Sequence, residues 1–162
     1  MIVEYIKGDI TETELSVIVH GVNCQNVMGS GVAKALFTKW EEVKWKYHAY
    51  CEHKEIINSN PDEYYEELLG DVDFVCVERD ENDKTKKTIV NAFTQFDYGY
   101  DNKKRVSYWA ISNCFKYIND FYSGKKIAIP NIGCGLAGGD WDIVKVLIDD
   151  ATPDIEVYVY EL

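Results

Sequence analysis

The feature that most constrains the fold of this chain is a glycine-rich loop set between an apolar run and an amphipathic segment. Residues 125–129 (KKIAI) are short, apolar and rich in β-branched side chains, which predicts a buried strand. Apolar residues then recur at helical spacing from Trp141 to Ile148, which predicts a helix. The four glycines between them allow positive φ and let the backbone approach a ligand closely. Because such a loop leaves amide groups pointing outward, it predicts a site for an anion such as phosphate.

A second loop of the same design follows an earlier apolar run. Residues 17–22 (VIVHGV) predict a strand buried on both faces, and Gly29-Ser30-Gly31 open a helix after a polar stretch. Unpaired amides and the helix dipole favour negative charge at a helix start. In an open α/β sheet, two such loops meet across the crevice at the carboxyl ends of the strands. One loop alone is well explained as a flexible connection, whereas the two together predict a ligand site.

Strands and helices alternate along the chain, without an internal repeat or a linker-like segment. The alternation predicts one domain over residues 1–162, an α/β fold of three layers around a mixed central sheet. Two apolar runs around the charged turn 79–87 predict a hairpin, and residues 54–70 predict an irregular connection with some helix. The expected strands are 2–6, 17–22, 72–77, 88–93, 125–129 and 155–160, and the expected helices are 31–50 with a break, 106–118 and one beginning at Trp141.

Composition excludes several classes of function. A net charge of −11 argues against general nucleic-acid binding, which needs clustered Lys and Arg. The sequence has no signal pattern and no apolar run as long as a membrane span, so no membrane partner is expected. The five cysteines lack CxxC spacing, which is typical of reduced thiols in a cytoplasmic protein and not of disulfides or zinc ligands. We therefore expect no metal and no cofactor.

The motifs along the chain resemble those of the macrodomain family, the ADP-ribose-binding fold. The resemblance covers nearly the whole chain, and its motifs occur in the family's order and spacing. The chain looks most like the small macrodomains that include ADP-ribose 1″-phosphate phosphatases. The motifs are Lys7-Gly8-Asp9-Ile10, residues 20–33, Asn91-Ala92-Phe93-Thr94-Gln95, residues 129–141 and a short final strand.

The resemblance also extends to the branch of the family that removes ADP-ribose from acidic side chains. Residues 129–136 (IPNIGCGL) are similar to that branch. Its members place a lysine nucleophile in the segment that corresponds to Ala92–Thr94 and an aspartate near Ala137. This chain has neither residue, so the resemblance argues against that mechanism here.

The resemblance implies roles for individual residues. Asp9, with Gly8 and the amide of Ile10, would receive the adenine amino group, and Asn23 would bind the distal ribose. Ordinary structural roles remain open for both, since Gly-Asp is a common turn and a loop asparagine often bonds its own backbone. Cys134 is expected to be a small loop residue and not a nucleophile. The diphosphate would lie between Gly29, Ser30, Gly31 and Val32 on one side and Ile132, Gly133, Cys134, Gly135 and Leu136 on the other, with Phe96 or Tyr98 stacking on a ribose.

Two residues are candidates for catalysis. His20 titrates near neutral pH and could protonate the departing 1″-oxygen. Asp140 ends the glycine loop and could position or activate water, or attack phosphorus. Asp140 also stands where a helix N-cap is expected, and His20 could be a hydrogen-bonded strand histidine.

Three functions follow from these assignments. The first is hydrolysis of ADP-ribose 1″-phosphate to ADP-ribose and phosphate. The second is an ADP-ribosyl glycohydrolase that acts on modified macromolecules or on O-acetyl-ADP-ribose. The third is an ADP-ribose reader without chemistry. ADP-ribose, its 1″-phosphate and ADP-ribosylated macromolecules are the expected partners.

Overall fold

A six-stranded sheet organises the computed structural model, which describes residues 1–57, 60, 66–97, 104–135 and 137–162. Tyr98 and Leu136 lie outside the described residues. The strand order is β1-β6-β5-β2-β4-β3. The elements are β1 (Ile2–Lys7), the 3₁₀ helix η1 (Ile10–Glu12), β2 (Val17–Asn23), α1 (Gly31–Lys39), α2 (Glu42–Ile57), β3 (Val72–Glu78), β4 (Lys86–Gln95), α4 (Tyr108–Phe121), β5 (Lys126–Ile129), α5 (Trp141–Ala151) and β6 (Glu156–Glu161).

The sheet is mixed, as the alternation of the sequence predicts. Strand β2 lies at its centre and pairs in parallel with both β4 and β5. Strands β1 and β6 and strands β5 and β6 are also parallel, whereas β3 returns antiparallel to β4 as the predicted hairpin. The carboxyl ends of β2 and β5 therefore reach the same edge of the sheet, and each leads into a glycine-containing loop.

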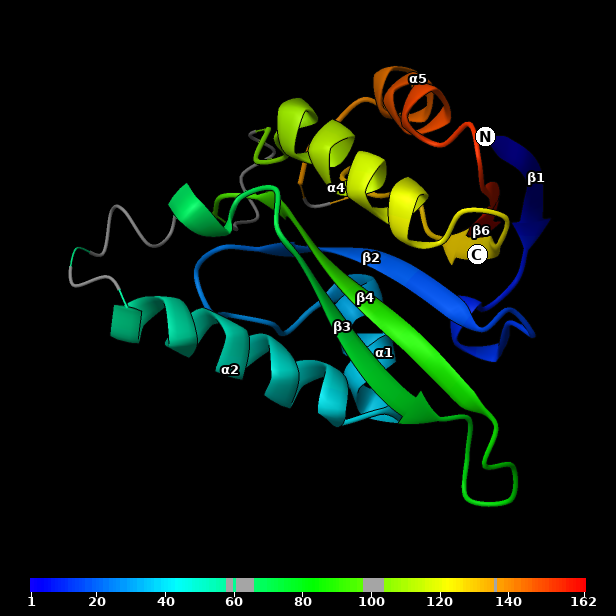
Figure 1. Cartoon of the computed structure of the whole chain (residues 1–162), viewed down its shortest axis with the longest axis horizontal. Coiled ribbons are helices and arrows are strands. Elements are labelled where there is room, and N and C mark those ends of the chain that lie inside the picture. Colours follow the sequence, from blue (N-terminus) through cyan, green and yellow to red (C-terminus); the bar gives the residue numbers. More distant parts are fainter. Residues whose placement is uncertain (58–59, 61–65, 98–103, 136) are drawn as a thin grey trace.

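Helices cover both faces of the sheet, α4 and α5 one face and α1 and α2 the other (Figure 1). Strand β2 shows why its sequence is apolar nearly throughout. Val17 and Val19 face the α4 and α5 layer, whereas Ile18 and Val22 face the α1 and α2 layer. Since successive side chains of a strand point to opposite faces, a strand covered on both sides needs an apolar residue at each position.

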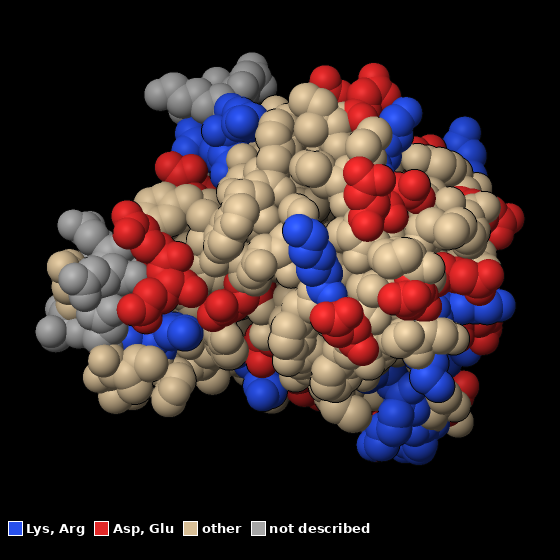
Figure 2. Space-filling model, turned by 45° about the horizontal axis from the view of Figure 1, so that its top comes forward, with Lys and Arg blue, Asp and Glu red and all other residues tan. Residues whose placement is uncertain are grey.

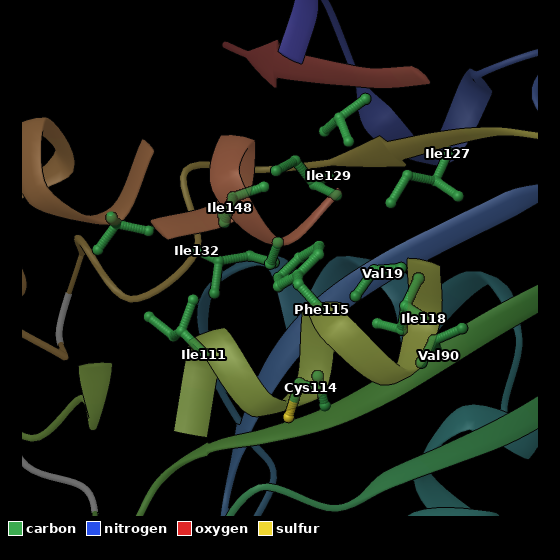
Figure 3. Packing of buried hydrophobic residues seen from close by; sticks show 14 of the residues in the cluster. Val19, Val90, Ile111, Cys114, Phe115, Ile118, Ile127, Ile129, Ile132 and Ile148 are labelled. Atoms are coloured by element: carbon green, nitrogen blue, oxygen red, sulfur yellow. The ribbon is translucent and has the colours of Figure 1, made fainter. Parts of the chain in front are cut away.

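The core under α4 joins side chains from helices and strands. Figure 3 shows Phe115 and Ile118 of α4 meeting Val19 of β2 and Val90 of β4, and all four are fully buried. Helix α4 begins at Tyr108 and ends at Phe121. Its N-cap is Ser107, whose hydroxyl oxygen accepts a hydrogen bond from the Ala110 amide. Its boundaries lie within a few residues of those predicted.

The helix predicted over residues 31–50 is two helices with a break at Trp40. The Trp40 indole donates to the carbonyl oxygens of Glu78 and Arg79, so its ring is held against the end of β3. Helix α2 then continues to Ile57, seven residues beyond the predicted end. The charged residues of the segment 51–57 hid this extension, because Tyr47 and Cys51 bury only one face of α2.

The β5–α5 loop packs tightly on one side and is open on the other. Gly133 has φ +77°, and a Cβ there would lie 2.6 Å from a Val106 methyl carbon. A Cβ on Gly139 would lie 2.5 Å from the Gly133 carbonyl oxygen, whose own partner is the Gly139 amide at 2.7 Å. A Cβ on Gly135, by contrast, would meet nothing within 4 Å. The first two glycines are thus required for packing, and the third leaves space.

This contrast predicts different stabilities for two matched variants. Gly133→Ala should lower the free energy of unfolding by about 2–4 kcal/mol, because it combines overpacking with a left-handed backbone. Gly135→Ala should change it by less than about 0.5 kcal/mol, as is usual at open surface positions. Urea denaturation of the two variants and the parent measures the difference. Equal stabilities would contradict the packing described here.

Candidate functional site

A pocket of about 620 Å³ opens at the carboxyl ends of β2, β5 and β6. The β2–α1 loop forms one wall, and the β5–α5 loop forms the other. Nine of the residues named from the sequence line it, which confirms that the two glycine-containing loops share one cavity. The lining residues are His20, Gly21, Val22, Asn23, Val27, Met28, Gly29, Ser30, Gly31, Val32, Ala33, Gln95, Pro130, Asn131, Ile132, Gly133, Gly135, Ala137, Tyr160, Glu161 and Leu162.

The first wall presents the start of α1. Ser30 is the N-cap residue, but its side chain makes no capping hydrogen bond, and the first helical bond within α1 is that from the Lys34 amide to the Ser30 carbonyl. Gly31 has φ +62°, and a Cβ there would enter open space. The amides of the first turn consequently have no acceptor within the helix and stand at the pocket, where a helix dipole adds positive potential.

The second wall is the β5–α5 loop. Gly133 and Gly135 line the pocket, whereas Cys134 does not. The Cys134 thiol instead lies 3.2 Å from the Ile132 carbonyl oxygen. Burial, with a smaller contribution from the charge of Asp140, raises the pKa of this thiol to about 11. A thiol with such a pKa is protonated at neutral pH, which agrees with a structural role for Cys134.

Apart from His20, the described lining residues of the pocket include one acidic or basic side chain, that of Glu161. Neither Lys nor Arg is one of these lining residues. On the face of the molecule drawn in Figure 2, the described basic side chains form small groups separated by acidic ones. Backbone N–H groups, which carry partial positive charge, are therefore the groups that this pocket offers to an anion.

Asn23 stands at the β2 end of the pocket and organises its own loop. Its Oδ1 accepts from the Gln25 amide at 2.9 Å and from the Tyr47 hydroxyl at 2.8 Å. Its Nδ2 donates to the Val27 carbonyl at 2.7 Å. The structural role left open by the sequence is thus present, and one N–H of the amide group remains for a ligand.

His20 is fully buried, although it is one of the lining residues. Its Nε2 lies 2.5 Å from Asn91 Oδ1, and Asn91 Nδ2 donates to the Val43 carbonyl. This chain of bonds assigns the ring proton to Nε2 and leaves Nδ1 as an acceptor with no partner among the described residues. Burial lowers the pKa of His20 to about 4, and the bond to Asn91 offsets only part of that effect. A neutral ring with its proton on Nε2 is suited to accept a hydrogen bond at Nδ1 and not to act as a general acid there.

Asp140 lies outside the described lining of the pocket. Its Oδ1 accepts from the Asp142 amide at 2.9 Å, so it is the N-cap of α5, and its own amide donates to the Tyr108 hydroxyl. The capping role that the sequence left open is therefore observed. Its carboxylate is exposed at the end of the glycine loop.

The segment after β1 lies apart from the main pocket. Asp9 is the N-cap of η1, and its Oδ1 accepts hydrogen bonds from the amide and the hydroxyl of Thr11. Gly8 and Asp9 line a second hollow of about 360 Å³, and Ile10 is buried in the core. Phe96 is exposed beyond the described lining, and its carbonyl accepts from the Cys24 amide.

Several lining residues carried no signal of their own in the sequence. Gln95 ends β4, Asn131 follows β5, and Tyr160 and Glu161 end β6. The rule that ligands bind at the carboxyl ends of parallel strands points to all of these positions once the strand order is known. The strand order itself depends on which strands pair in the folded sheet, and the sequence does not give it.

Comparison with known proteins places the chain among structural relatives of defined fold. No family model matches the sequence. A structure of a protein of unknown function from Bacteroides thetaiotaomicron is 30% identical, with 100% and 98% of the two chains covered and a TM-score of 0.79. A macrodomain protein from Streptomyces coelicolor is 25% identical, with 100% and 99% covered and a TM-score of 0.75. The chain has the macrodomain fold.

Three further relatives match most of this chain, and the names of two of them describe an activity or a ligand. An uncharacterized 17.5 kDa protein of Enterobacteria phage T4 is 29% identical over 99% of this chain and 97% of its own length. A DNA ADP-ribosyl glycohydrolase of Mycobacterium tuberculosis is 24% identical over 98% of this chain, which spans only 42% of that protein. Thermosipho africanus DarTG, solved in complex with ADP-ribose, is 20% identical over 94% of this chain and 40% of its own, with a TM-score of 0.70.

No helix within the described residues is long and apolar enough to cross a membrane. The same residues include no cluster of three His, Cys, Asp or Glu side chains placed to hold a metal ion. All five cysteines are free thiols.

The buried, neutral state of His20 predicts a pH dependence of stability. The folded pKa of about 4 lies below the ordinary value of 6.5, so protons bind more tightly to the unfolded chain between these values. The contribution of His20 is thus complete above pH 6.5 and is lost as pH falls toward 4, by up to about 3 kcal/mol. His20→Gln should lose less stability than the parent between pH 7 and pH 4.5 in urea denaturation. Parallel losses would show that His20 is charged or solvated in the folded state.

Proposed function

We propose that this chain binds ADP-ribose and its derivatives. The observation that carries the proposal is the pair of glycine-containing loops, which face each other across one pocket without a Lys or Arg side chain among the described lining residues. A diphosphate bound there would be held by the amides of the α1 start and of the β5–α5 loop. The volume of about 620 Å³ is within the range of small-molecule and cofactor sites.

The comparisons support this choice of ligand. The DarTG protein of Thermosipho africanus was solved with ADP-ribose, and a macrodomain of Oceanobacillus iheyensis was solved with ADPR. Both share the fold of this chain. Their sequences are 20% and 15% identical to this one.

Titration calorimetry should give one ADP-ribose per chain and much weaker binding of AMP. Gly31→Val should abolish binding, because a β-branched side chain on this backbone fills the space that a phosphate would occupy. Gly124→Val is the matched control, since Gly124 has φ +80° with an open Cβ position but lies before β5, at the opposite end of that strand. It should bind normally despite similar backbone strain.

Affinity should change little between low and moderate salt, because backbone amides and not Lys or Arg side chains would hold the phosphates. A steep salt dependence of the kind that follows counterion release would contradict this mode of recognition. Normal binding by Gly31→Val would exclude the α1 loop from the site.

Hydrolysis at the distal ribose is the second candidate function, with two alternative substrates. The 1″-phosphate is favoured by the exposed Asp140 carboxylate at the end of the glycine loop. DNA-linked ADP-ribose is favoured by the relatives whose names include DNA ADP-ribosyl glycohydrolase. Their similarity covers 98% and 95% of this chain, which spans 42% and 40% of those proteins. In either reaction a neutral His20 would accept a hydrogen bond and not donate a proton.

Phosphate release from ADP-ribose 1″-phosphate and release of ADP-ribose from modified DNA should be measured side by side, with and without EDTA. If Asp140 positions or activates water, Asp140→Asn should lower kcat by about 10²-fold or more while keeping stability, because Asn caps a helix as well as Asp. Asp142→Asn, two residues further along α5, is the control and should keep kcat. Full activity of Asp140→Asn would make Asp140 a cap alone, and turnover of neither substrate would leave a binding module.

A further inference from the structure

The β2–α1 loop is bonded to α2, a helix that contributes no residue to the described lining of the pocket. Residues 24–30 of the loop have no helix or strand structure, and the loop runs beside α2 (Figure 1). Four of its residues line the pocket, namely Val27, Met28, Gly29 and Ser30. A segment without regular structure takes its shape from the hydrogen bonds that other parts of the chain give it.

The Tyr47 hydroxyl is the centre of these bonds. It accepts from the Val27 amide at 3.1 Å, and its own proton is available to Asn23 Oδ1 at 2.8 Å and to the Asn23 carbonyl oxygen at 2.9 Å. One oxygen atom thus joins the end of β2 to the middle of the loop. The Tyr47 ring is fully buried and stacks on Phe93 of β4, with ring centroids 5.8 Å apart. Because close packing holds the ring in place, the hydroxyl is a fixed point for the loop.

His48, the next residue of α2, bonds the loop at a second place. Its Nδ1 lies 2.6 Å from Asn26 Oδ1, and because an amide oxygen only accepts, Nδ1 carries the donated proton. Asn26 has φ +60°, in the left-handed region that a residue with a side chain adopts at a cost. The bond from His48 therefore helps to hold the loop in this bend.

We propose that Tyr47, assisted by His48, is a positioning residue that keeps the β2–α1 loop in the shape that binds the ligand. The inference rests on the proposed binding of ADP-ribose and adds what prepares this wall of the pocket. A loop that is fixed before binding loses little entropy when the ligand arrives. A loosened loop binds only in the fraction of molecules that have the right shape, and the apparent affinity falls by that fraction.

Tyr47→Phe tests the proposal, because it removes the hydroxyl and keeps the ring. Titration calorimetry should show ADP-ribose binding at least about tenfold more weakly than to the parent, since the loop has lost its central bond. In the unliganded variant, NMR should show the Val27 amide exchanging its hydrogen at least about tenfold faster, because that amide has lost its acceptor. Saturating ADP-ribose should slow this exchange again, as the ligand selects the ordered loop.

Tyr50→Phe is the matched control on the same helix. The Tyr50 ring also stacks on Phe93, with centroids 5.4 Å apart, but its hydroxyl donates to Asp71 Oδ2 at 2.9 Å. This variant should lose thermal stability as Tyr47→Phe does, because each loses a hydroxyl bond under the same ring. It should keep the parent's affinity and the parent's exchange rate at Val27, which a merely structural role of Tyr47 would not predict.

A second pair of variants tests the bond from His48. His48→Phe removes the donor to Asn26 and should weaken ADP-ribose binding about threefold or more. His48→Asn keeps an N–H donor close to the position of Nδ1 and should bind more tightly than His48→Phe. Binding by His48→Phe at the parent's affinity would overturn the part assigned to His48.

The outcomes separate this inference from the proposed function. Equal weakening of binding by Tyr47→Phe and Tyr50→Phe would trace the loss to general stability and overturn the inference. Parent-like affinity of Tyr47→Phe, or weaker binding without faster exchange at Val27, would also overturn it, and each of these results leaves ADP-ribose binding intact. A parent that does not bind ADP-ribose overturns the proposed function and this inference together.

Discussion

The parallel alignment of β2 and β5 is the constraint on which the site depends. Each strand is apolar and covered on both faces, and the two pair in parallel through Ile18 and Ala128. Because both faces of these strands are apolar, burial keeps them in the middle of the sheet, between the two helical layers. Their carboxyl ends then reach the same edge, and two loops 100 residues apart form one pocket.

The β5–α5 loop divides its glycines between packing and access. Gly133 and Gly139 lie against Val106 with no room for a Cβ, so one side of the loop is rigidly supported from the segment before α4. Gly135 faces open space at the pocket. A loop held in this way loses little conformational entropy when a ligand binds, which is how preorganised sites gain affinity.

Electrostatics explains how an acidic protein can present an anion site. The net charge of −11 belongs to the whole chain, whereas the described lining of the pocket includes no Lys or Arg and is formed largely by two loops and the start of a helix. Amide dipoles act over a few ångströms at fixed positions, and surface charges beyond about a Debye length are screened by salt. The local potential at the loops is therefore set by the backbone more than by the net charge.

The sequence by itself determined the layers, the order of elements and the two glycine loops, because apolar periodicity and glycine spacing are local signals. It left two roles open for each of two residues. Asn23 could bind the distal ribose or bond its own loop, and Asp140 could act in catalysis or cap a helix. Tertiary structure decided the rest. Burial against Asn91 makes His20 neutral. The amide and hydroxyl of Thr11 donate to Asp9 Oδ1, and β6 brings Glu161 to the pocket from 30 residues beyond Asn131. Charge state, hydrogen-bond partners and long-range neighbours depend on groups distant in the chain, so no local pattern could reveal them.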